Sequence, residues 1–313
     1  MLGKTASGLF WMFRHLERSE NTTRLVEAGF RMSLTRAAGN DNEWASIIMT
    51  AGCSQAYLEH YDNYDTANVL DFLLRNRTNA SSVMSIMENA RNNARMVRTA
   101  LTREVWEAIN GGWLILKERL AKPVATSELP SVLACIRQQS ALVRAALHGT
   151  KLRNDGYRFC RLGTFSERAD NMARILDVKY YVLLPSTSYV GSSLDNVQWE
   201  TILRSASAES AFHWIHGGET SPLDIADFLI RDPQMPRSLI YCCEKMRGNL
   251  ALLADQYGER TPCLEMAEVM TTTLRGQSVD QIFKIGLHEF LVNFLEQNNS
   301  LATQIERDYR FQE

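Results

Sequence analysis

Acidic, amide and arginine side chains are concentrated in one short stretch near the start of the chain, "LERSENTTRLV" at residues 16–26. Glu17, Glu20, Asn21 and Arg24 follow one another at helical spacing, so that on a helix they share an arc of about 100°. Carboxylates can act as general acids or bases, and arginine can bind a carboxylate through two hydrogen bonds. This stripe therefore has the groups for acid–base chemistry or for recognition of an anionic ligand.

The same stripe recurs 150 residues later, and other blocks recur in the same order. "EWASII" at 43–48 matches "QWETIL" at 198–203, and "DFLLRN" at 71–76 matches "DFLIRD" at 227–232. This order predicts an internal duplication, with a first repeat at residues 1–150 and a second at 151–313. The candidate binding residues are the polar positions that recur in both repeats: Glu17, Glu20, Asn21, Arg24, Glu88, Arg91, Glu167, Asp170, Asn171, Arg174, Glu244 and Arg247.

The position of the stripe on its helix predicts that it faces inward. Phe10 and Phe13 precede Glu17 in the same row, where a bundle helix normally presents apolar residues to the core. Small residues such as Ser19 and Thr23 run beside the row and would let a neighbouring helix approach closely. Buried carboxylates need cationic or hydrogen-bonding partners. We expect these partners on segments 87–95 and 243–249, which carry the Glu-x-x-Arg pairs.

Three interpretations of the stripe remain open at this level. It is an exposed pair of the i,i+4 type, a buried network that fixes helix register, or a site for a ligand or partner. A metal centre is not expected, because Arg91 and Arg247 stand where a di-iron bundle would place histidine. Glu209, His213 and His216 share a helical face, but a core or rim role is the simpler interpretation. The six tryptophans fall on apolar helical faces and are expected in the core.

Composition limits the fold and the partners. The 313 residues are 45% hydrophobic, with seven prolines, and long segments have apolar residues at helical period, which predicts an almost entirely α-helical protein. Such segments are 81–101, 128–147, 197–215 and 279–309. A net charge of −2 gives no reason to expect binding to nucleic acid or to a membrane surface. The six cysteines form no C-x-x-C pair, and no segment resembles a signal peptide or a membrane span, so we expect reduced thiols, no cofactor and a cytoplasmic protein.

Four blocks of the chain together resemble one known family. They are "GLFWMFRHLERSENTTRLVE" near the start, "GYRFCRLGTFSERADNMARILDVKYY" in the middle, "DFLIRDPQMPRSL" later and "LHEFLVNFLEQNNSLATQIERDYRF" at the end. With these blocks the chain resembles the bacterial α-E family, an all-helical domain of unknown function with a Glu-x-x-Arg signature. The resemblance covers essentially the whole chain. It places the signature acids and arginines on the candidate residues above, apart from Asn21 and Asn171.

The resemblance also implies partners. Members of the family are typically encoded beside a circularly permuted ATP-grasp protein, often with a transglutaminase-like protease, and a peptide-forming or peptide-modifying system has been proposed. We therefore expect two six-helix halves in one pseudo-twofold bundle that acts as a non-catalytic helper or substrate-binding partner of an ATP-grasp amide-bond ligase. One alternative is an enzyme with Glu17 or Glu167 as acid or base. The other is a purely structural helical interaction protein.

Overall fold

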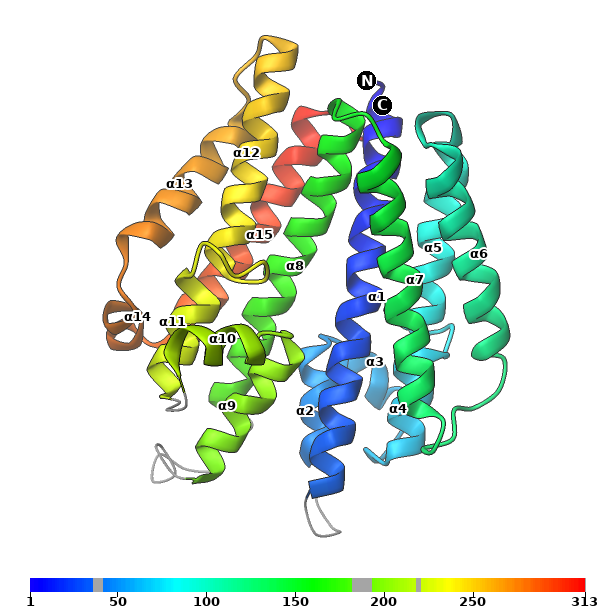
Figure 1. Ribbon diagram of the computed structural model, residues 1–313, viewed down its shortest axis with the longest axis vertical. Coiled ribbons are helices and arrows are strands. Elements are labelled where there is room, and N and C mark those ends of the chain that lie inside the picture. The colour runs from blue at the N-terminus through cyan, green and yellow to red at the C-terminus, as the bar shows by residue number, and fades with distance from the viewer. Residues whose placement is uncertain (36–41, 182–192, 218–220, 313) are drawn as a thin grey trace. The chain divides into compact units, whose positions relative to one another are not determined.

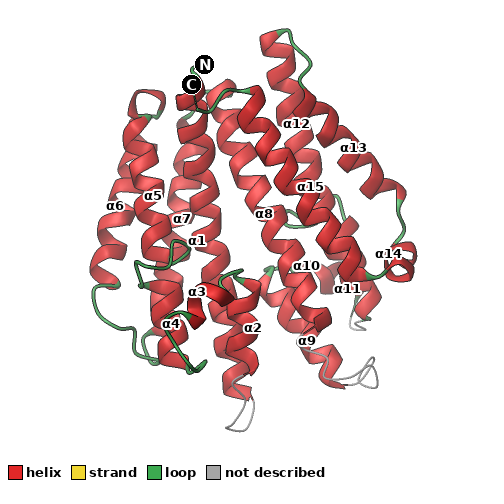
Figure 2. Cartoon of the chain, turned by 180° about the vertical axis from the view of Figure 1, so that it is seen from behind, coloured by secondary structure: helices red, strands yellow, loops and turns green. Residues whose placement is uncertain are grey.

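Helices form all the regular secondary structure in the described part of the chain, which comprises residues 1–35, 42–181, 193–217 and 221–312 (Figures 1 and 2). The coordinates are a computed structural model. The prediction of an all-α fold is confirmed, because no strand occurs among these residues.

The chain divides into two compact units, one comprising residues 1–167 and 309–313 and the other residues 168–308. The first unit holds α1 (Gly3–Thr35), α2 (Asn42–Thr50), α3 (Ser54–Leu58), α4 (Thr66–Leu74), α5 (Val83–Met96), the 3-10 helix η1 (Arg98–Ala100), α6 (Arg103–Arg119) and α7 (Leu129–Thr150). Helix α8 (Asp155–Tyr181) begins in the first unit and ends in the second. The second unit continues with α9 (Ser193–Ser205), α10 (Glu209–His216), α11 (Pro222–Arg231), α12 (Leu239–Tyr257), α13 (Pro262–Gly276), α14 (Val279–Ile285) and α15 (Leu287–Asp308).

In the first unit, α1 lies against α5 and α7, and α6 packs on both of these helices, as both views show (Figures 1 and 2). The last residues of the chain belong to this unit, where the Phe311 ring lies 5.5 Å from the Phe10 ring. The start of α8 also packs closely on α1. A Cβ atom added at Gly163 would lie 2.1 Å from the Phe10 carbonyl oxygen, so only glycine permits this approach. The contact brings Glu167 beside α1.

In the second unit, α13 packs against α12 and α15, while α11 packs against α12 (Figure 1). The helix starts resemble those of the first unit. The Ser82 side chain accepts a hydrogen bond from a backbone N–H at the start of α5, and Ser238 does the same at the start of α12. The side chains of Asp65 and Ser221 cap α4 and α11 in the same way. Local sequence therefore specifies where these helices begin.

Two of the four predicted helical segments are interrupted. Segment 197–215 contains parts of two helices, because Ser207 has a φ of 52° and the helical path is broken there. Segment 279–309 is divided between α14 and α15 at Gly286, whose φ is 112°. Apolar periodicity continues across both breaks, which is why the sequence pattern alone did not reveal them.

The prediction that all tryptophans lie in the core is wrong for Trp214, which is 91% exposed, and Trp11 and Trp106 are only half-buried. Helix α10 is about two turns long and buries Phe212 completely. Trp214 follows two positions later, a rotation of about 200° around the helix. Its side chain therefore lies on the side opposite Phe212.

Candidate functional site

The polar stripe of α1 is buried, as its place in the helical pattern predicted. Glu17, Glu20 and Asn21 are each no more than 2% exposed, and Phe10 and Phe13 in the same row are buried with them. Arg24 is partly buried, with its side chain 16% exposed. The exposed-pair interpretation therefore does not describe this helix, although Glu20 and Arg24 do form an i,i+4 pair.

Two arginines neutralise Glu20. The Arg24 guanidinium donates from Nη2 to Oε1 of Glu20 over 2.7 Å, and Arg144 of α7 forms an ion pair with the other carboxylate oxygen. The same Arg144 nitrogen lies 4.0 Å from Oε2 of Glu17. Arg144 therefore joins α7 to two acids of α1 at once.

A second ion pair joins α1 and α7, seven residues after Glu20 on α1 and seven residues before Arg144 on α7. Arg137 of α7 pairs with Glu27 of α1, and Arg31 donates to the same carboxylate over 3.1 Å. Between the two links, the hydroxyls of Ser19 and Ser140 are 3.2 Å apart, so the helices are in close contact there. This confirms that small residues beside the stripe admit a neighbouring helix.

Glu167 on α8 is held by two arginines of α1. Arg14 donates from Nε to Oε2 over 3.1 Å, and Arg18 donates from Nη2 to the same oxygen over 2.8 Å and from Nε to Oε1. Burial by itself would raise the pKa of Glu167, but the charges and hydrogen bonds of Arg18 and Arg14 outweigh it and hold the pKa below its usual value. This carboxylate is therefore ionised at neutral pH and is poorly suited to donate a proton.

His15 lies beside this cluster and is kept neutral. Its desolvation, followed by the positive charges of Arg18 and Arg14, lowers its pKa to about 4, although Glu167 acts in the opposite direction. Its ring lies 5.8 Å from the Trp11 ring. The Arg14 guanidinium also lies over that indole, 4.8 Å from the ring centroid. The α1 end of the cluster is thus both charged and aromatic.

Within the second unit, Asp170 makes the described ion pair of the α8 stripe. Asp170 is buried and accepts a hydrogen bond from Nε of Arg174 over 2.7 Å, in an i,i+4 pair whose arginine side chain is 37% exposed. Asn171 is half-buried. One acid further along α8, Asp177, lies 2.6 Å from Nδ1 of His288 on α15.

The Glu-x-x-Arg pairs of α5 and α12 are not the partners that the sequence pattern predicted for the stripe. Glu88 pairs with Arg77 over 2.7 Å, and Arg91 donates to Asn110 of α6 over 2.8 Å. In α12, Glu244 pairs with Arg275 of α13, and the buried Nε of Arg247 donates no hydrogen bond within the described residues. Arg91 thus contacts α6 and Glu244 contacts α13, whereas arginines of α1 and α7 pair with Glu20 and Glu167.

The residues that the sequence analysis missed as partners are Arg14, Arg18, Arg137 and Arg144. A signal for two of them was present. Arg137 and Arg144 are seven residues apart in a predicted amphipathic helix, which is the spacing of Glu20 and Glu27. Matching spacing on two helices is compatible with a ladder of ion pairs, but nothing local shows that the two helices are neighbours.

The other candidate groups have ordinary structural surroundings. His213 lies within hydrogen-bonding distance of the Gly217 carbonyl, His216 stacks on Phe212, and Glu209 pairs with Arg204. None of the six cysteines, all of which lie in the described part of the chain, forms a disulfide bond, and five are buried. Burial raises the pKa of Cys53 to about 12, which makes it a poor nucleophile at neutral pH.

Among the described residues, no group of three or more histidine, cysteine, aspartate or glutamate side chains is arranged to hold a metal ion. In the same ranges, no helix combines the length and the apolar character needed to cross a bilayer.

Comparison with protein families identifies the chain. Residues 1–309 match the family named Alpha-E, described as a predicted alpha-helical domain with a conserved ER motif. The chain belongs to the Alpha-E family. Glu17–Arg18 and Glu167–Arg168 are adjacent acid–arginine pairs in this Alpha-E chain, and Arg18 and Glu167 bind each other.

The curated relatives of this Alpha-E chain are longer proteins. An uncharacterized protein of Mycobacterium bovis is 22% identical over 304 residues, which cover 90% of this chain and 33% of the relative. An uncharacterized protein of Mycobacterium tuberculosis is 21% identical over the same length and with the same coverage. The chain thus spans about a third of the length of these relatives. No solved structure shows a significant match.

Proposed function

We propose that this Alpha-E chain is a non-catalytic helper or substrate-binding partner of an ATP-grasp amide-bond ligase that forms or modifies peptides. The kind of partner comes from the genomic context that the family resemblance implies. The cytoplasm is the compartment we propose, because such a ligase consumes ATP and because none of the six cysteines forms a disulfide bond.

One observation carries the non-catalytic part of the proposal. Glu20 and Glu167, two buried carboxylates of the first unit, are already paired with arginines, and the pKa of Glu167 lies below its usual value. A general acid or base that works near neutral pH needs a pKa raised toward neutrality, and this environment has the opposite effect. The arrangement therefore supports a binding or structural role over acid–base catalysis.

We further propose that the stripe fixes the register of the helices. The ion pairs of Arg137 and Arg144 hold α7 at one axial position on α1, because a shift by one turn would leave buried charges unpaired. The matching order of caps and stripes supports an origin by duplication of a six-helix repeat, with the repeats related by a pseudo-twofold axis. In this proposal the buried acids hold the helices in register, and ligands bind elsewhere on the protein.

The relatives support a role beside other domains. In the mycobacterial proteins the matched segment is joined to about twice its own length of further chain. A domain that recurs within longer proteins is well placed to position or hold a substrate for a neighbouring activity. The activity of those longer proteins is not known from their names.

The proposal is tested by copurification of the tagged chain from its native cell, followed by reconstitution with the ATP-grasp protein. We expect the ligase in the purified complex, and product formation only when ligase and ATP are present. Product formation by the purified chain alone would contradict the helper role. Absence of any ATP-grasp protein from the complex, in cells that express one, would contradict the proposed partner.

The role of the stripe is tested separately with the double variant Glu20→Gln, Arg24→Leu. If the stripe only sets helix register, the folded variant still binds the ligase and supports its product. Loss of binding while the circular dichroism spectrum remains native would assign the stripe to partner or substrate binding. Arg103→Ala is the matched control, because Arg103 forms an exposed i,i+4 pair with Glu107 on α6.

A further inference from the structure

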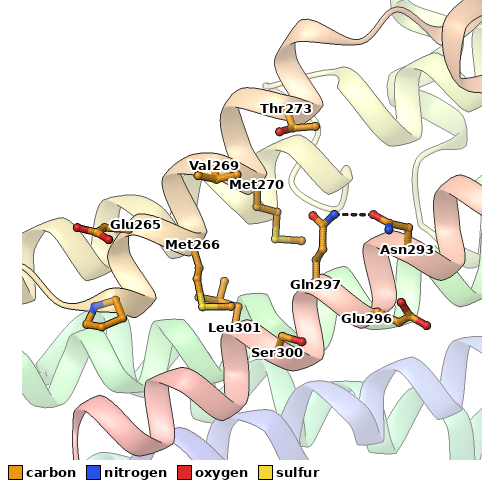
Figure 3. A pocket seen from close by; sticks show the side chains of 11 residues that line it. Glu265, Met266, Val269, Met270, Thr273, Asn293, Glu296, Gln297, Ser300 and Leu301 are labelled. Atoms are coloured by element: carbon orange, nitrogen blue, oxygen red, sulfur yellow. Dashed lines mark hydrogen bonds between the residues drawn. The ribbon is translucent and has the colours of Figure 1, made fainter.

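A groove in the second unit lies between α13 and α15, and none of its lining residues belongs to the charged stripe (Figure 3). Its volume is about 560 Å³. Met266, Met270 and Leu301 contribute apolar side chains to its lining, and Val269 at its edge is 66% exposed. An apolar groove that is rimmed by polar residues commonly marks a binding surface.

The groove is elongated along the helices. Its α13 wall includes Pro262, Met266, Val269 and Thr273, so it covers one helical face over about three turns, or roughly 16 Å. The α15 wall runs from Asn293 to Leu301 at the same helical spacing. A groove of this length between two helices matches one face of a third helix better than a compact ligand.

The charges at the groove are acidic. Glu265 of α13 lies toward one end and Glu296 of α15 toward the other (Figure 3), and no lysine or arginine lines the space between them. Glu296 forms no ion pair with any described residue. At the other end, Arg260 forms ion pairs with both Glu265 and Glu268 at exposed positions. The rim therefore retains negative charge that a cationic partner would complement.

The side chains of the lining suit a helical partner. Methionine is flexible and polarisable, so it adapts to different apolar side chains. Gln297 and Asn293 hydrogen-bond to each other along α15 and leave polar groups at the edge for a solvated rim. This combination of an adaptable apolar strip with a polar, acidic border is typical of grooves that accept an amphipathic helix.

We propose that the α13–α15 groove binds an amphipathic helix of a partner protein, about three turns long, with lysine or arginine residues flanking its apolar face. Its apolar side chains pack against Met266 and Val269, and its cations lie beside Glu265 and Glu296. The inference concerns a surface distinct from the charged stripe. It holds whether or not the partner is an ATP-grasp ligase.

The test uses the full chain and a display library of 16-residue peptides. The peptides have apolar residues at positions that share one helical face and random residues elsewhere. We expect selected peptides to be enriched in lysine and arginine over aspartate and glutamate, and to bind more weakly as salt concentration rises. Enrichment in acidic residues, or a selection that yields no binder at this groove, would overturn the proposal.

Two variants locate the binding. Val269→Lys places a charge on the apolar strip and should weaken the selected peptides by at least about tenfold, whereas Leu252→Lys on α12, a residue outside the groove lining that is 45% exposed, should not. Glu296→Lys should weaken them about three- to tenfold and reduce the salt dependence, with Glu104→Lys on α6 as the matched control. Circular dichroism verifies folding, and equal binding by the groove variants and their controls contradicts the site.

A second copy of the chain is the competing occupant. Analytical ultracentrifugation of the wild-type chain and of Val269→Lys separates the two cases. We expect the same association state for both. A dimer that Val269→Lys dissociates would overturn the partner-helix proposal and assign the groove to self-association.

Discussion

Two helix pairs in the molecule, α6 with α7 and α13 with α15, share a buried pattern but differ where the helices meet. Buried positions of one pair recur 158 residues later in the other: Val105 and Cys263, Ile109 and Ala267, Leu116 and Leu274, Leu133 and Leu291, Ile136 and Phe294, Val143 and Leu301, Leu147 and Ile305. The apolar pattern is therefore nearly the same in both pairs. The differences lie in one glycine and two arginines.

The glycine controls how closely the helices pack. At Gly112 of α6, an added Cβ would lie 3.3 Å from the Cβ of Gln139 on α7, so that contact is already tight. The residues 158 positions later are Met270 and Gln297, and both line the groove between α13 and α15. A methionine in place of a glycine keeps two helices apart. At this level of the two pairs, α6 and α7 are therefore in tight contact, whereas α13 and α15 leave a groove.

The arginines control how the neighbouring stripe is neutralised. Arg137 and Arg144 of α7 pair with acids of α1, whereas Leu295 and Ala302 occupy the corresponding positions of α15. Only His288 of α15 pairs with an acid of α8 among the contacts described within the second unit. A repeated apolar pattern is thus combined with ion pairs between helices in one unit and with a groove in the other.

The largest expected effect comes from removing the most heavily paired acid. Glu167→Gln leaves Arg14 buried without an anionic partner and removes one of the two carboxylate oxygens that accept hydrogen bonds from Arg18. We expect the free energy of unfolding to fall by about 3–5 kcal/mol, as for other broken buried pairs. Urea denaturation measures the change. A loss no greater than that of the exposed-pair variant Arg103→Ala would contradict a stabilising role.

The next largest effect is a pH dependence of the free energy of unfolding, which arises from the first unit. The pKa of His15 is about 4 in the folded chain and 6.5 when unperturbed, so the unfolded state binds the proton more tightly. The part of the free energy of unfolding that depends on neutral His15 is fully present above pH 6.5 and is lost as the pH falls toward 4. Its total is on the order of 3 kcal/mol. The lowered pKa of Glu167 removes further stability below about pH 4.3. Urea denaturation at pH 7.5 and 4.5 should show a smaller pH dependence for His15→Gln than for wild type.

A third prediction concerns the closed helix pair. Gly112→Met introduces into α6 the residue found in α13 and should reduce the free energy of unfolding by about 1–3 kcal/mol, because the contact with Gln139 has no room for it. Gly111→Met is the matched control, since an added Cβ there meets no atom within 4 Å. Thermal denaturation compares the two. Equal stability of both variants would show that Gly112 does not determine the packing.

The smallest effect is expected in the second unit. Asp170→Asn removes one i,i+4 ion pair whose arginine is partly exposed, so the loss should be about 1 kcal/mol or less. Glu20→Gln, at the matching position of α1, affects two arginines and should cost more. Urea denaturation of the two variants measures the asymmetry directly. Equal losses would mean that both stripes are stabilised in the same way.

Periodicity identified the helices but not every break. The hydroxyl and carboxylate caps at residues 65, 82, 221 and 238 act on their own helices, so their signals are local. Ser207 departs from the helical path through its backbone conformation, which apolar spacing does not report. The burial of the α1 stripe was predictable, because a row that begins with Phe10 and Phe13 faces the core.

The sequence by itself determined the helical class, the inward orientation of the α1 stripe and the two acid–arginine blocks, because helical spacing and side-chain chemistry are local properties. The tertiary structure alone decided which arginines neutralise which acids, since Arg144 meets Glu20 only when α7 packs on α1. It also decided that α13 and α15 leave a groove, because the separation of two helices depends on side chains from both. These are contacts between residues far apart in the chain, and no local pattern specifies them.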